Sequence, residues 1–230
     1  MKQFCLLFLF GLMNLSLQAQ PSHEAFDILL KKHVSSDGKV NYKNFKTDKT
    51  ALENYIKTLI ANVPQENWSK NDKMTYWINA YNALTINLII QNYPLSKITD
   101  LDGGKTWDVK RYTFGNKKLS LNDIENTILR PMSDARIHFA INCAAKSCPP
   151  LHNQAFTINN LNNLLDSRTK SFINSEANTL KTNEIKVSKI FDWYGKDFGD
   201  LITYFNKYSK VKIGKTAKIS FQEYDWRLNE

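Results

Sequence analysis

The residues best suited to chemistry lie in one stretch, RIHFAINCAAKSCPPL, from Arg136 to Leu151. His138 stands five residues before Cys143, and Cys148 follows after another five. Histidine can act as a general base at physiological pH, and a thiolate can act as a nucleophile. This spacing is compatible with a thiol-dependent catalytic site. It is equally compatible with a loop that a Cys143–Cys148 disulfide holds in shape.

A thiol enzyme also needs a carboxylate that orients its histidine and donors that stabilise an oxyanion. Asp192 and Asp225 each precede a tryptophan in an aromatic and acidic cluster, and either could orient His138. The side-chain amides of Asn79 or Asn82 could supply the donors. In the structural alternative, the aspartates pair with basic residues or cap turns, and the amides hydrogen-bond neighbouring backbone.

Asn79 and Asn82 belong to the strongest helix signal in the chain, which runs from Met74 to Ile90. Ser69 and Asp72 are typical of a cap at its start. The helix is apolar on nearly every face, so we expect it to be buried. The two amides share one face, because they fall three residues apart. Buried amides must find hydrogen-bond partners, so this face meets either a polar pocket or neighbouring backbone.

The rest of the pattern predicts a helix-rich α+β fold with one small mixed or antiparallel sheet. Turn and periodicity signals predict helices over 24–34, 49–61, 123–129, 157–173 and 201–205, a hairpin over 112–119, and strands over 137–141, 185–187 and 217–221. The strand over 137–141 would carry His138 and end at the cysteines. On an extended strand, His138 and Cys143 would point to opposite faces.

The first 19 residues are typical of a secretory signal peptide. Lys2 precedes a short apolar run, and Leu17-Gln18-Ala19 forms a plausible cleavage box. No second long apolar run follows, so we expect no transmembrane segment. These features predict a secreted or periplasmic protein whose mature part, residues 22–230, is a single domain.

Export bears on the two cysteines, because thiols tend to pair in an oxidising compartment. A turn across the four intervening residues would bring their Cα atoms within the ~4.4–6.8 Å that a disulfide requires. We therefore expect a Cys143–Cys148 disulfide. The catalytic alternative, with one cysteine free as a nucleophile, remains open.

Charge and composition exclude some partners. The formal net charge is +9, but the lysines are scattered and no nucleic-acid-binding motif occurs, so we expect no nucleic-acid partner. No pair of histidines or cysteines has the spacing of a metal site. We therefore expect no metal, and we expect no other cofactor. We also expect the protein to be a monomer.

Two hypotheses follow. In the first, which we favour, the protein binds an unknown small molecule or envelope protein in a polar pocket beside a disulfide-held loop. In the second, it is a thiol-dependent hydrolase or acyltransferase in which Cys148 or Cys143 attacks and His138 is the base. The residues expected to line the pocket are Trp77, Asn79, Asn82 and Ser147.

Several motifs together resemble the family called domain of unknown function 547. They cover almost all of the expected mature chain in order: GKVNY (38–42), YWINAYNALTINLI (76–89), LSLNDIENTILR (119–130), RIHFAINCAAKSCPPL (136–151), KIFDWYGKDFG (189–199) and EYDWRLNE (223–230). Asn41 stands where an acidic residue is more usual in the family. The resemblance implies an exported bacterial member and no settled activity. The order of buried helix, hairpin and His138 strand is distantly similar to papain-like and transglutaminase-like enzymes, whose helix instead begins with the cysteine.

Overall fold

The computed structural model describes residues 20–230, and the predicted signal peptide lies outside them. The elements are, in chain order, α1 (Glu24–His33), α2 (Tyr42–Phe45), η1 (Lys46–Asp48), α3 (Lys49–Ala61), α4 (Lys70–Asn92), η2 (Ile98–Gly104), η3 (Thr106–Asp108), β1 (Tyr112–Phe114), β2 (Lys117–Leu119), η4 (Asp123–Leu129), η5 (Arg130–Met132), η6 (Ala135–Phe139), α5 (Leu161–Ile173), β3 (Thr179–Leu180), β4 (Glu184–Val187), α6 (Ile190–Trp193), α7 (Gly195–Phe198), α8 (Leu201–Tyr208) and β5 (Lys218–Phe221).

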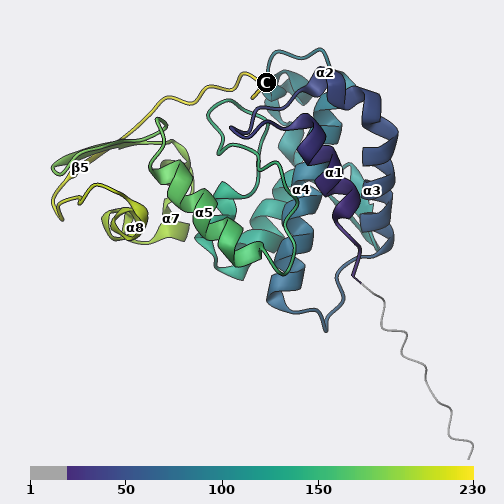
Figure 1. Ribbon diagram of the computed structural model, residues 1–230, viewed down its shortest axis with the longest axis horizontal. Coiled ribbons are helices and arrows are strands. Elements are labelled where there is room, and N and C mark those ends of the chain that lie inside the picture. The colour runs from purple at the N-terminus through teal and green to yellow at the C-terminus, as the bar shows by residue number, and fades with distance from the viewer. Residues whose placement is uncertain (1–19) are drawn as a thin grey trace, which may run out of the picture.

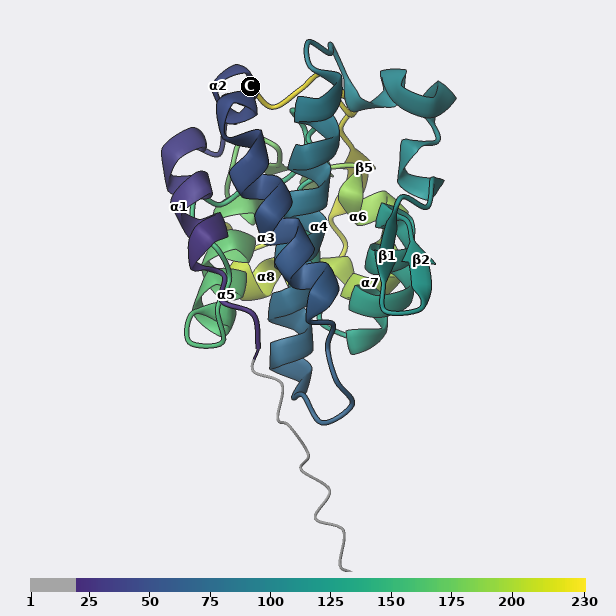
Figure 2. The same ribbon diagram turned by 90° about the vertical axis from the view of Figure 1, so that its right-hand side faces the viewer.

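Helix α4 forms the centre of one end of the molecule, where α1, α2 and α3 lie around it (Figures 1 and 2). Ser69 and Asp72 form a reciprocal capping box, as predicted, which satisfies backbone donors at the helix start. Every residue from Met74 to Ile90 is buried. The apolar side chains of these helices make one hydrophobic cluster that includes Phe26, Leu52 and Leu84. Burial of this apolar surface is the main force that holds α4 in place.

The other end contains α5, α7, α8 and a small sheet (Figure 1). Strand β4 pairs antiparallel with β3 and parallel with β5. Buried side chains of these elements, and of η6 and α6, form a second hydrophobic cluster, which includes Phe139, Phe191 and Phe205. The molecule is therefore α+β with two packed clusters, and helices dominate.

The C-terminal segment runs back from β5 to the helical end, where the chain ends near α2 (Figure 1). Its backbone is tied down there, since the Val40 N–H donates to the Asn229 carbonyl at 2.9 Å and the Leu228 N–H donates to the Ser96 carbonyl at 3.1 Å. It also crosses the cysteine loop, where the Lys146 N–H donates to the Arg227 carbonyl at 2.7 Å. This return path brings the last aromatic residues of the chain beside Cys143 and Cys148.

Most elements predicted from the sequence are confirmed, as is the α+β class. Helices α1, α3, α5 and α8 and strands β4 and β5 fall within or close to the predicted ranges. The hairpin pairs β1 with β2 in antiparallel register across Gly115-Asn116. Gly115 has a φ of 59°, a left-handed conformation that glycine adopts without strain.

The strand predicted over 137–141 is wrong. Residues Ala135–Phe139 form the 3₁₀-helix η6, which begins where the Asp134 carboxylate accepts a hydrogen bond from the Arg136 N–H at 3.1 Å. Periodicity cannot separate a short buried helix from a short buried strand, because both appear as an uninterrupted apolar run. The argument that placed His138 and Cys143 on opposite faces depended on that strand and fails with it.

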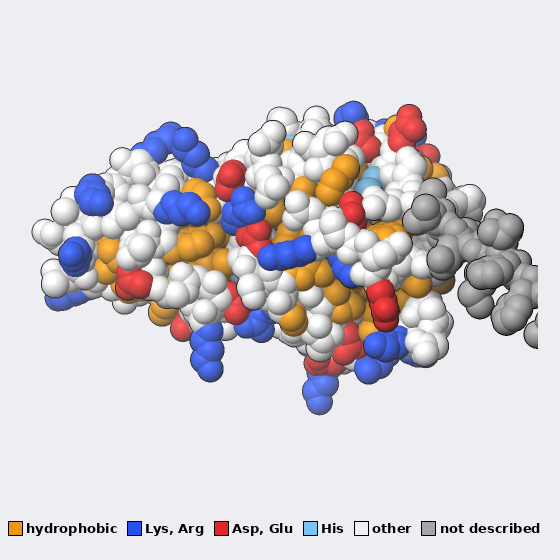
Figure 3. Space-filling view, turned by 90° about the horizontal axis from the view of Figure 1, so that it is seen from below, with side chains coloured by type: hydrophobic (Ala, Val, Ile, Leu, Met, Phe, Trp, Pro, Cys, Tyr) orange, Lys and Arg blue, Asp and Glu red, His pale blue; other side chains and the backbone are white. Residues whose placement is uncertain are grey.

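Lysine and arginine side chains are spread over the face seen in Figure 3, with acidic side chains between them. This agrees with the scattered basic residues of the sequence. Between residues 20 and 230, no helix is long and apolar enough to cross a membrane.

Candidate functional site

A pocket of about 300 Å³ lies where the two hydrophobic clusters meet. Six aromatic rings from distant parts of the chain line it: Tyr81, Trp107, Trp193, Tyr194, Tyr224 and Trp226. Trp193 is 45% exposed, so the pocket opens to solvent on its side. The volume lies near the lower end of the range for small-molecule sites.

Trp226 contacts three of the other rings, two of them at steep angles. Trp226 lies 5.5 Å from Trp107 and 4.6 Å from Tyr224 between ring centroids, with interplanar angles of 59° and 54°. Trp193 stacks on Trp226 at 5.8 Å with an angle of 25°. Rings arranged in this way form adjoining walls of a box.

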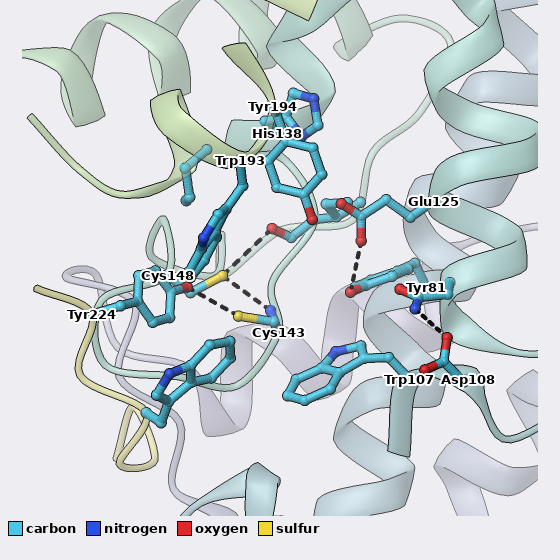
Figure 4. Close-up of a pocket in the computed structure, with 14 residues that line it drawn as sticks. Tyr81, Trp107, Asp108, Glu125, His138, Cys143, Cys148, Trp193, Tyr194 and Tyr224 are labelled. Atoms are coloured by element: carbon cyan, nitrogen blue, oxygen red, sulfur yellow. Dashed lines mark hydrogen bonds between the residues drawn. The ribbon is translucent and has the colours of Figure 1, made fainter. Parts of the chain in front are cut away.

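A buried carboxyl group, Glu125, forms part of the pocket wall. Its Oε2 accepts a hydrogen bond from the Tyr81 hydroxyl at 3.3 Å, and Figure 4 shows the Tyr194 hydroxyl turned toward the same carboxyl. Burial raises the pKa of Glu125, while hydrogen bonds from Tyr194 and Tyr81 and the charge of Arg130 partly oppose the rise. A carboxyl with a raised pKa that faces a pocket is a candidate for ligand recognition or proton transfer.

Glu125 projects from η4, which is a π-helix rather than an α-helix. The N–H of Arg130 donates to the Glu125 carbonyl, an i→i+5 hydrogen bond. π-helical turns are rare and occur frequently at functional sites. This one carries Glu125 in the lining of the pocket.

Tyr194 is held between two other side chains. The His138 ring lies 4.2 Å from its ring centroid, and the Arg130 guanidinium carbon lies 5.2 Å from the same point. Asp197 joins the two supports: its Oδ2 lies 2.8 Å from His138 Nε2 and 2.6 Å from Arg130 Nε. Arg130, Asp197 and His138 thus fix the ring whose hydroxyl faces Glu125.

Electrostatics keep His138 neutral. The residue is 3% exposed, and burial lowers its pKa to about 4, although the hydrogen bond and charge of Asp197 act in the opposite direction. The pKa of Asp197 is also lowered, chiefly by its hydrogen bond with Arg130. The pair at neutral pH is therefore a neutral imidazole beside an ionised carboxylate.

The predicted Cys143–Cys148 disulfide is absent, and both residues are free thiols. The Cys148 Sγ accepts a hydrogen bond from the Cys143 N–H at 3.1 Å, and the Cys143 Sγ lies 3.2 Å from the Tyr224 hydroxyl (Figure 4). Each sulfur therefore has a polar partner as a thiol. Both line the pocket, with Cys148 buried and Cys143 half-buried.

The two thiols differ in acidity. A hydrogen bond with Cys148, and to a smaller extent one with Tyr224, lowers the pKa of Cys143 against the effect of burial. Burial raises the pKa of Cys148 well above its usual value. Cys143 is therefore the sulfur that ionises first, and it is the more reactive thiol.

The predicted partners of His138 require correction. Between residues 20 and 230, no hydrogen bond joins His138 to either thiol, although all three residues line the pocket. Asp197, and neither Asp192 nor Asp225, contacts the histidine. Asp192 pairs with Lys189 and Asp225 pairs with Arg227, so both follow the structural alternative.

The two predicted amides, Asn79 and Asn82, together with Asn142, form what we call the amide clamp. Asn79 exchanges two hydrogen bonds with the backbone of Phe156, at 2.7 and 3.0 Å. Asn82 donates to the Ala140 carbonyl at 2.9 Å and accepts from the Asn142 N–H at 2.8 Å. These contacts engage the oxygen and the nitrogen of each amide, and neither side chain belongs to the lining of the pocket.

The remaining predicted lining residues also lie elsewhere. Trp77 is buried against Tyr76 and Phe114 in the helical cluster. Ser147 accepts a hydrogen bond from the Asp225 N–H at 2.9 Å, which ties the cysteine loop to the C-terminal segment. None of the four residues predicted to line a pocket belongs to the lining of this one.

Sequence reasoning missed Glu125, Tyr81 and Tyr194 as pocket residues. Glu125 lies in LSLNDIENTILR, where the sequence predicts only a short helix, and its one signal is an acidic residue among the apolar positions of that helix. Trp193 and Trp226 belong to the two aromatic and acidic clusters, whose sequence does not by itself indicate a pocket. Across the described part of the chain, no group of three His, Cys, Asp or Glu residues is arranged to hold a metal ion.

Comparison with known proteins adds one finding. Residues 65–173 match the family described as "Protein of unknown function, DUF547", so this segment is a DUF547 domain. It contains α4, η4, the cysteine loop and α5. Four aromatic walls of the pocket follow it in the chain: Trp193, Tyr194, Tyr224 and Trp226. No curated protein and no solved structure matches the chain.

Proposed function

We propose that this protein binds a small organic molecule in the aromatic pocket. The observation that carries the proposal is the convergence of six aromatic rings and a buried carboxyl on one cavity of about 300 Å³. Apolar pockets with a few placed polar groups are the usual form of small-molecule sites. A cavity of this size favours a small molecule over a protein partner.

The polar groups indicate how such a ligand would be oriented. The hydroxyls of Tyr81 and Tyr194 and the carboxyl of Glu125 face one side of the pocket, and the Cys143 thiol faces another (Figure 4). A ligand that presents one polar end to Glu125 and an apolar body to the tryptophans would satisfy both. The ligand would be influenced only indirectly by Arg130, Asp197 and His138, because these residues hold the Tyr194 ring in place.

We further propose that the protein functions outside the cytoplasm as a monomer. Support for export comes from the first 19 residues, whose charge, apolar run and cleavage box are typical of a signal peptide. A periplasmic or secreted binding protein of this kind would meet its ligand in solution through the side of the pocket that Trp193 leaves open.

A thiol-dependent transferase or hydrolase is the second candidate, favoured by the lowered pKa of Cys143. In that reaction the Cys143 thiolate would attack the carbonyl carbon of an ester or amide, and the bond to the alcohol or amine would break as this leaving group took up a proton. Water or another acceptor would then cleave the thioester, releasing the acyl group and restoring the thiol. His138 is a poor base for this step, since its Nε2 is engaged by Asp197 and its pKa is low. The binding function therefore ranks first.

One experiment tests the binding site and separates the two candidates. Small molecules that raise the melting temperature would be compared for their effect on alkylation of Cys143, followed by peptide mass spectrometry in the Cys148→Ser variant. Ligands in the pocket should slow the alkylation, and they should still bind the Cys143→Ser variant.

Stabilising ligands that leave the alkylation rate unchanged would reject the pocket as the binding site. An acyl adduct on Cys143 that turns over, together with loss of turnover in Cys143→Ser, would favour the enzyme instead. A matched control is Ser147→Ala, which alters the same loop outside the pocket lining.

A further inference from the structure

We propose that the ligand of this pocket carries a positive charge spread over an alkylated ammonium group, held among the tryptophan and tyrosine rings with Glu125 as its counter-ion. The inference rests on the proposed binding function and names the chemical class of the ligand. Three independent features of the pocket support it: its charge, its ring arrangement and the desolvation of its carboxyl.

The pocket has the opposite charge character to the rest of the protein. The full chain has 31 Lys and Arg residues against 22 Asp and Glu, and basic side chains are spread over the surface in Figure 3. Within residues 20–230, the pocket lining includes two carboxyl residues, Glu125 and Asp108, and neither a lysine nor an arginine. An anionic ligand would meet a buried carboxyl in a lining that supplies no lysine or arginine to pair with the ligand.

The guanidinium of Arg130, whose charge acts on Glu125, is already paired with another carboxylate. Arg130 places Nε 2.6 Å and an Nη atom 2.9 Å from the two carboxylate oxygens of Asp197. It packs on the ring of Tyr194, and it is not among the lining residues. Because Arg130 forms a bidentate pair with Asp197, it compensates the negative charge of Glu125 only in part. A positively charged ligand could pair with Glu125 directly.

The rings are arranged as a box rather than a flat stack. The ring plane of Trp226 is inclined by 59° to that of Trp107 and by 54° to that of Tyr224. The ring of Trp193 stacks on Trp226 with a centroid distance of 5.8 Å. A cation near several ring faces is attracted by each ring quadrupole, and tryptophan gives the strongest attraction. Boxes of aromatic rings bind quaternary and methylated ammonium groups through these cation–π interactions.

Burial makes Glu125 responsive to such a ligand. The groups that face it are the hydroxyls of Tyr81 and Tyr194, with the charges of Arg130 and Asp197 further out. Desolvation disfavours its ionised form, and a bound cation would restore the lost stabilisation. The same desolvation strengthens the attraction, because the pocket interior screens charge less than water does.

The test uses three probes of nearly equal shape: choline, its neutral tert-butyl analogue, and the anion tert-butylacetate. Each is titrated into the full-length protein while tryptophan fluorescence is followed, since three of the five tryptophans line the pocket. Choline should bind at least about tenfold more tightly than the neutral analogue, and the anion should bind most weakly.

Glu125→Gln should remove most of the preference for choline while the neutral analogue binds as before. Trp226→Leu, which keeps an apolar side chain but removes the ring, should also reduce it. Trp68→Phe is the matched control, because Trp68 packs on the helical cluster outside the pocket and should leave the preference intact.

The outcomes separate this inference from the proposed function. Equal binding of choline and the neutral analogue, with both slowing Cys143 alkylation, would overturn the charge inference and support a binding pocket. Tighter binding of the anion would overturn it as well. If none of the three probes binds, the cation class is rejected, and the alkylation experiment decides the binding function by itself.

Discussion

Two polar regions lie beside α4 and differ in what their polar atoms face. In the amide clamp, Asn79 and Asn82 are both buried and spend both amide ends on backbone groups. In the aromatic pocket, Glu125 is just as buried, but it shares an open cavity with Tyr81 and a half-buried thiol. Residues of both kinds come from the same helix, because Tyr81 and Asn82 are neighbours on α4.

The difference lies in hydrogen-bond saturation. A buried amide with both ends paired to backbone is a structural fastener, and removing it leaves two backbone groups unpaired. A buried carboxylate that faces a cavity can still accept hydrogen bonds from a ligand. Its removal from water lowers the free energy of unfolding of the protein. Stability should therefore depend on the amide clamp, and binding should depend on the pocket.

The largest expected effect concerns the amide clamp. Asn82→Ala should lower the free energy of unfolding by about 3 kcal/mol, because it strands the Ala140 carbonyl and the Asn142 N–H inside the protein. Chemical denaturation at pH 7 measures this change. Asn87→Ala is the control on the same helix and should cost clearly less, since Asn87 makes one long hydrogen bond of 3.5 Å to Tyr112. Equal losses would refute the distinction.

The next effect concerns the support of Tyr194. Because the pKa of His138 falls to about 4 in the folded protein, against about 6.5 in an unfolded chain, the unfolded state binds an extra proton between these values. Stability contributed by the neutral imidazole is complete above pH 6.5 and is lost as the pH falls toward 4, by up to about 1.4 kcal/mol per pH unit. Denaturation of His138→Gln should show a flatter slope there. An unchanged slope would mean that the folded imidazole is not kept neutral.

Asp197 should act in a lower pH range. Its folded pKa is depressed, so its contribution is present above the unfolded value of about 3.9 and is lost only as the pH falls below it. Asp197→Asn serves as the companion variant to His138→Gln. It should change stability most at neutral pH and least in strong acid.

A smaller effect should separate the two thiols. Cys143 should be alkylated at least about tenfold faster than Cys148, the factor that one pKa unit gives in thiolate fraction. Tyr224→Phe should slow the reaction at Cys143, because it removes a hydrogen bond to that sulfur. Peptide mass spectrometry measures both rates. Faster labelling of Cys148, or no labelling of either without reductant, would contradict a pocket with two free thiols.

The smallest effect on stability is expected at Glu125. Its folded pKa is raised, so ionisation above the unfolded pKa weakens the folded state. Glu125→Gln should therefore be as stable as the parent protein at pH 7, or up to about 1 kcal/mol more stable, with no advantage at pH 4. A large loss in thermal and chemical denaturation would place Glu125 with the amide clamp.

The sequence predicted those parts of the fold whose signals are local. The capping box at Ser69, the apolar faces of α4 and the Gly115-Asn116 turn all act over a few residues, and each was confirmed. The segment over 137–141 could not be assigned in this way. A short buried strand and a short buried 3₁₀-helix would both bury these five residues, so the pattern does not distinguish them. The feature that begins the helix is the Asp134 cap, which lies before the predicted segment.

The candidate site was predicted only in part. His138, Cys143 and Cys148 do line one pocket, yet the histidine supports Tyr194 and makes no hydrogen bond to a thiol in the described part of the chain. The partner of the histidine is Asp197. Asp192 and Asp197 both lie in the segment KIFDWYGKDFG (189–199), and nothing in its sequence indicates which of the two contacts His138. The choice depends on how η6, which carries His138, packs against α7, which carries Asp197, and this packing joins residues far apart in the chain.

The helical periods, the hairpin turn and the close spacing of the two thiols can be read from the sequence, because they are properties of neighbouring residues. Which polar groups are satisfied and which face a cavity depends on the packing of distant segments. That outcome depends on the C-terminal segment, which returns across the molecule and brings Tyr224 and Trp226 to Cys143. Such contacts join residues some 80 positions apart, as in the 81-residue separation of Cys143 and Tyr224, and no local pattern encodes them.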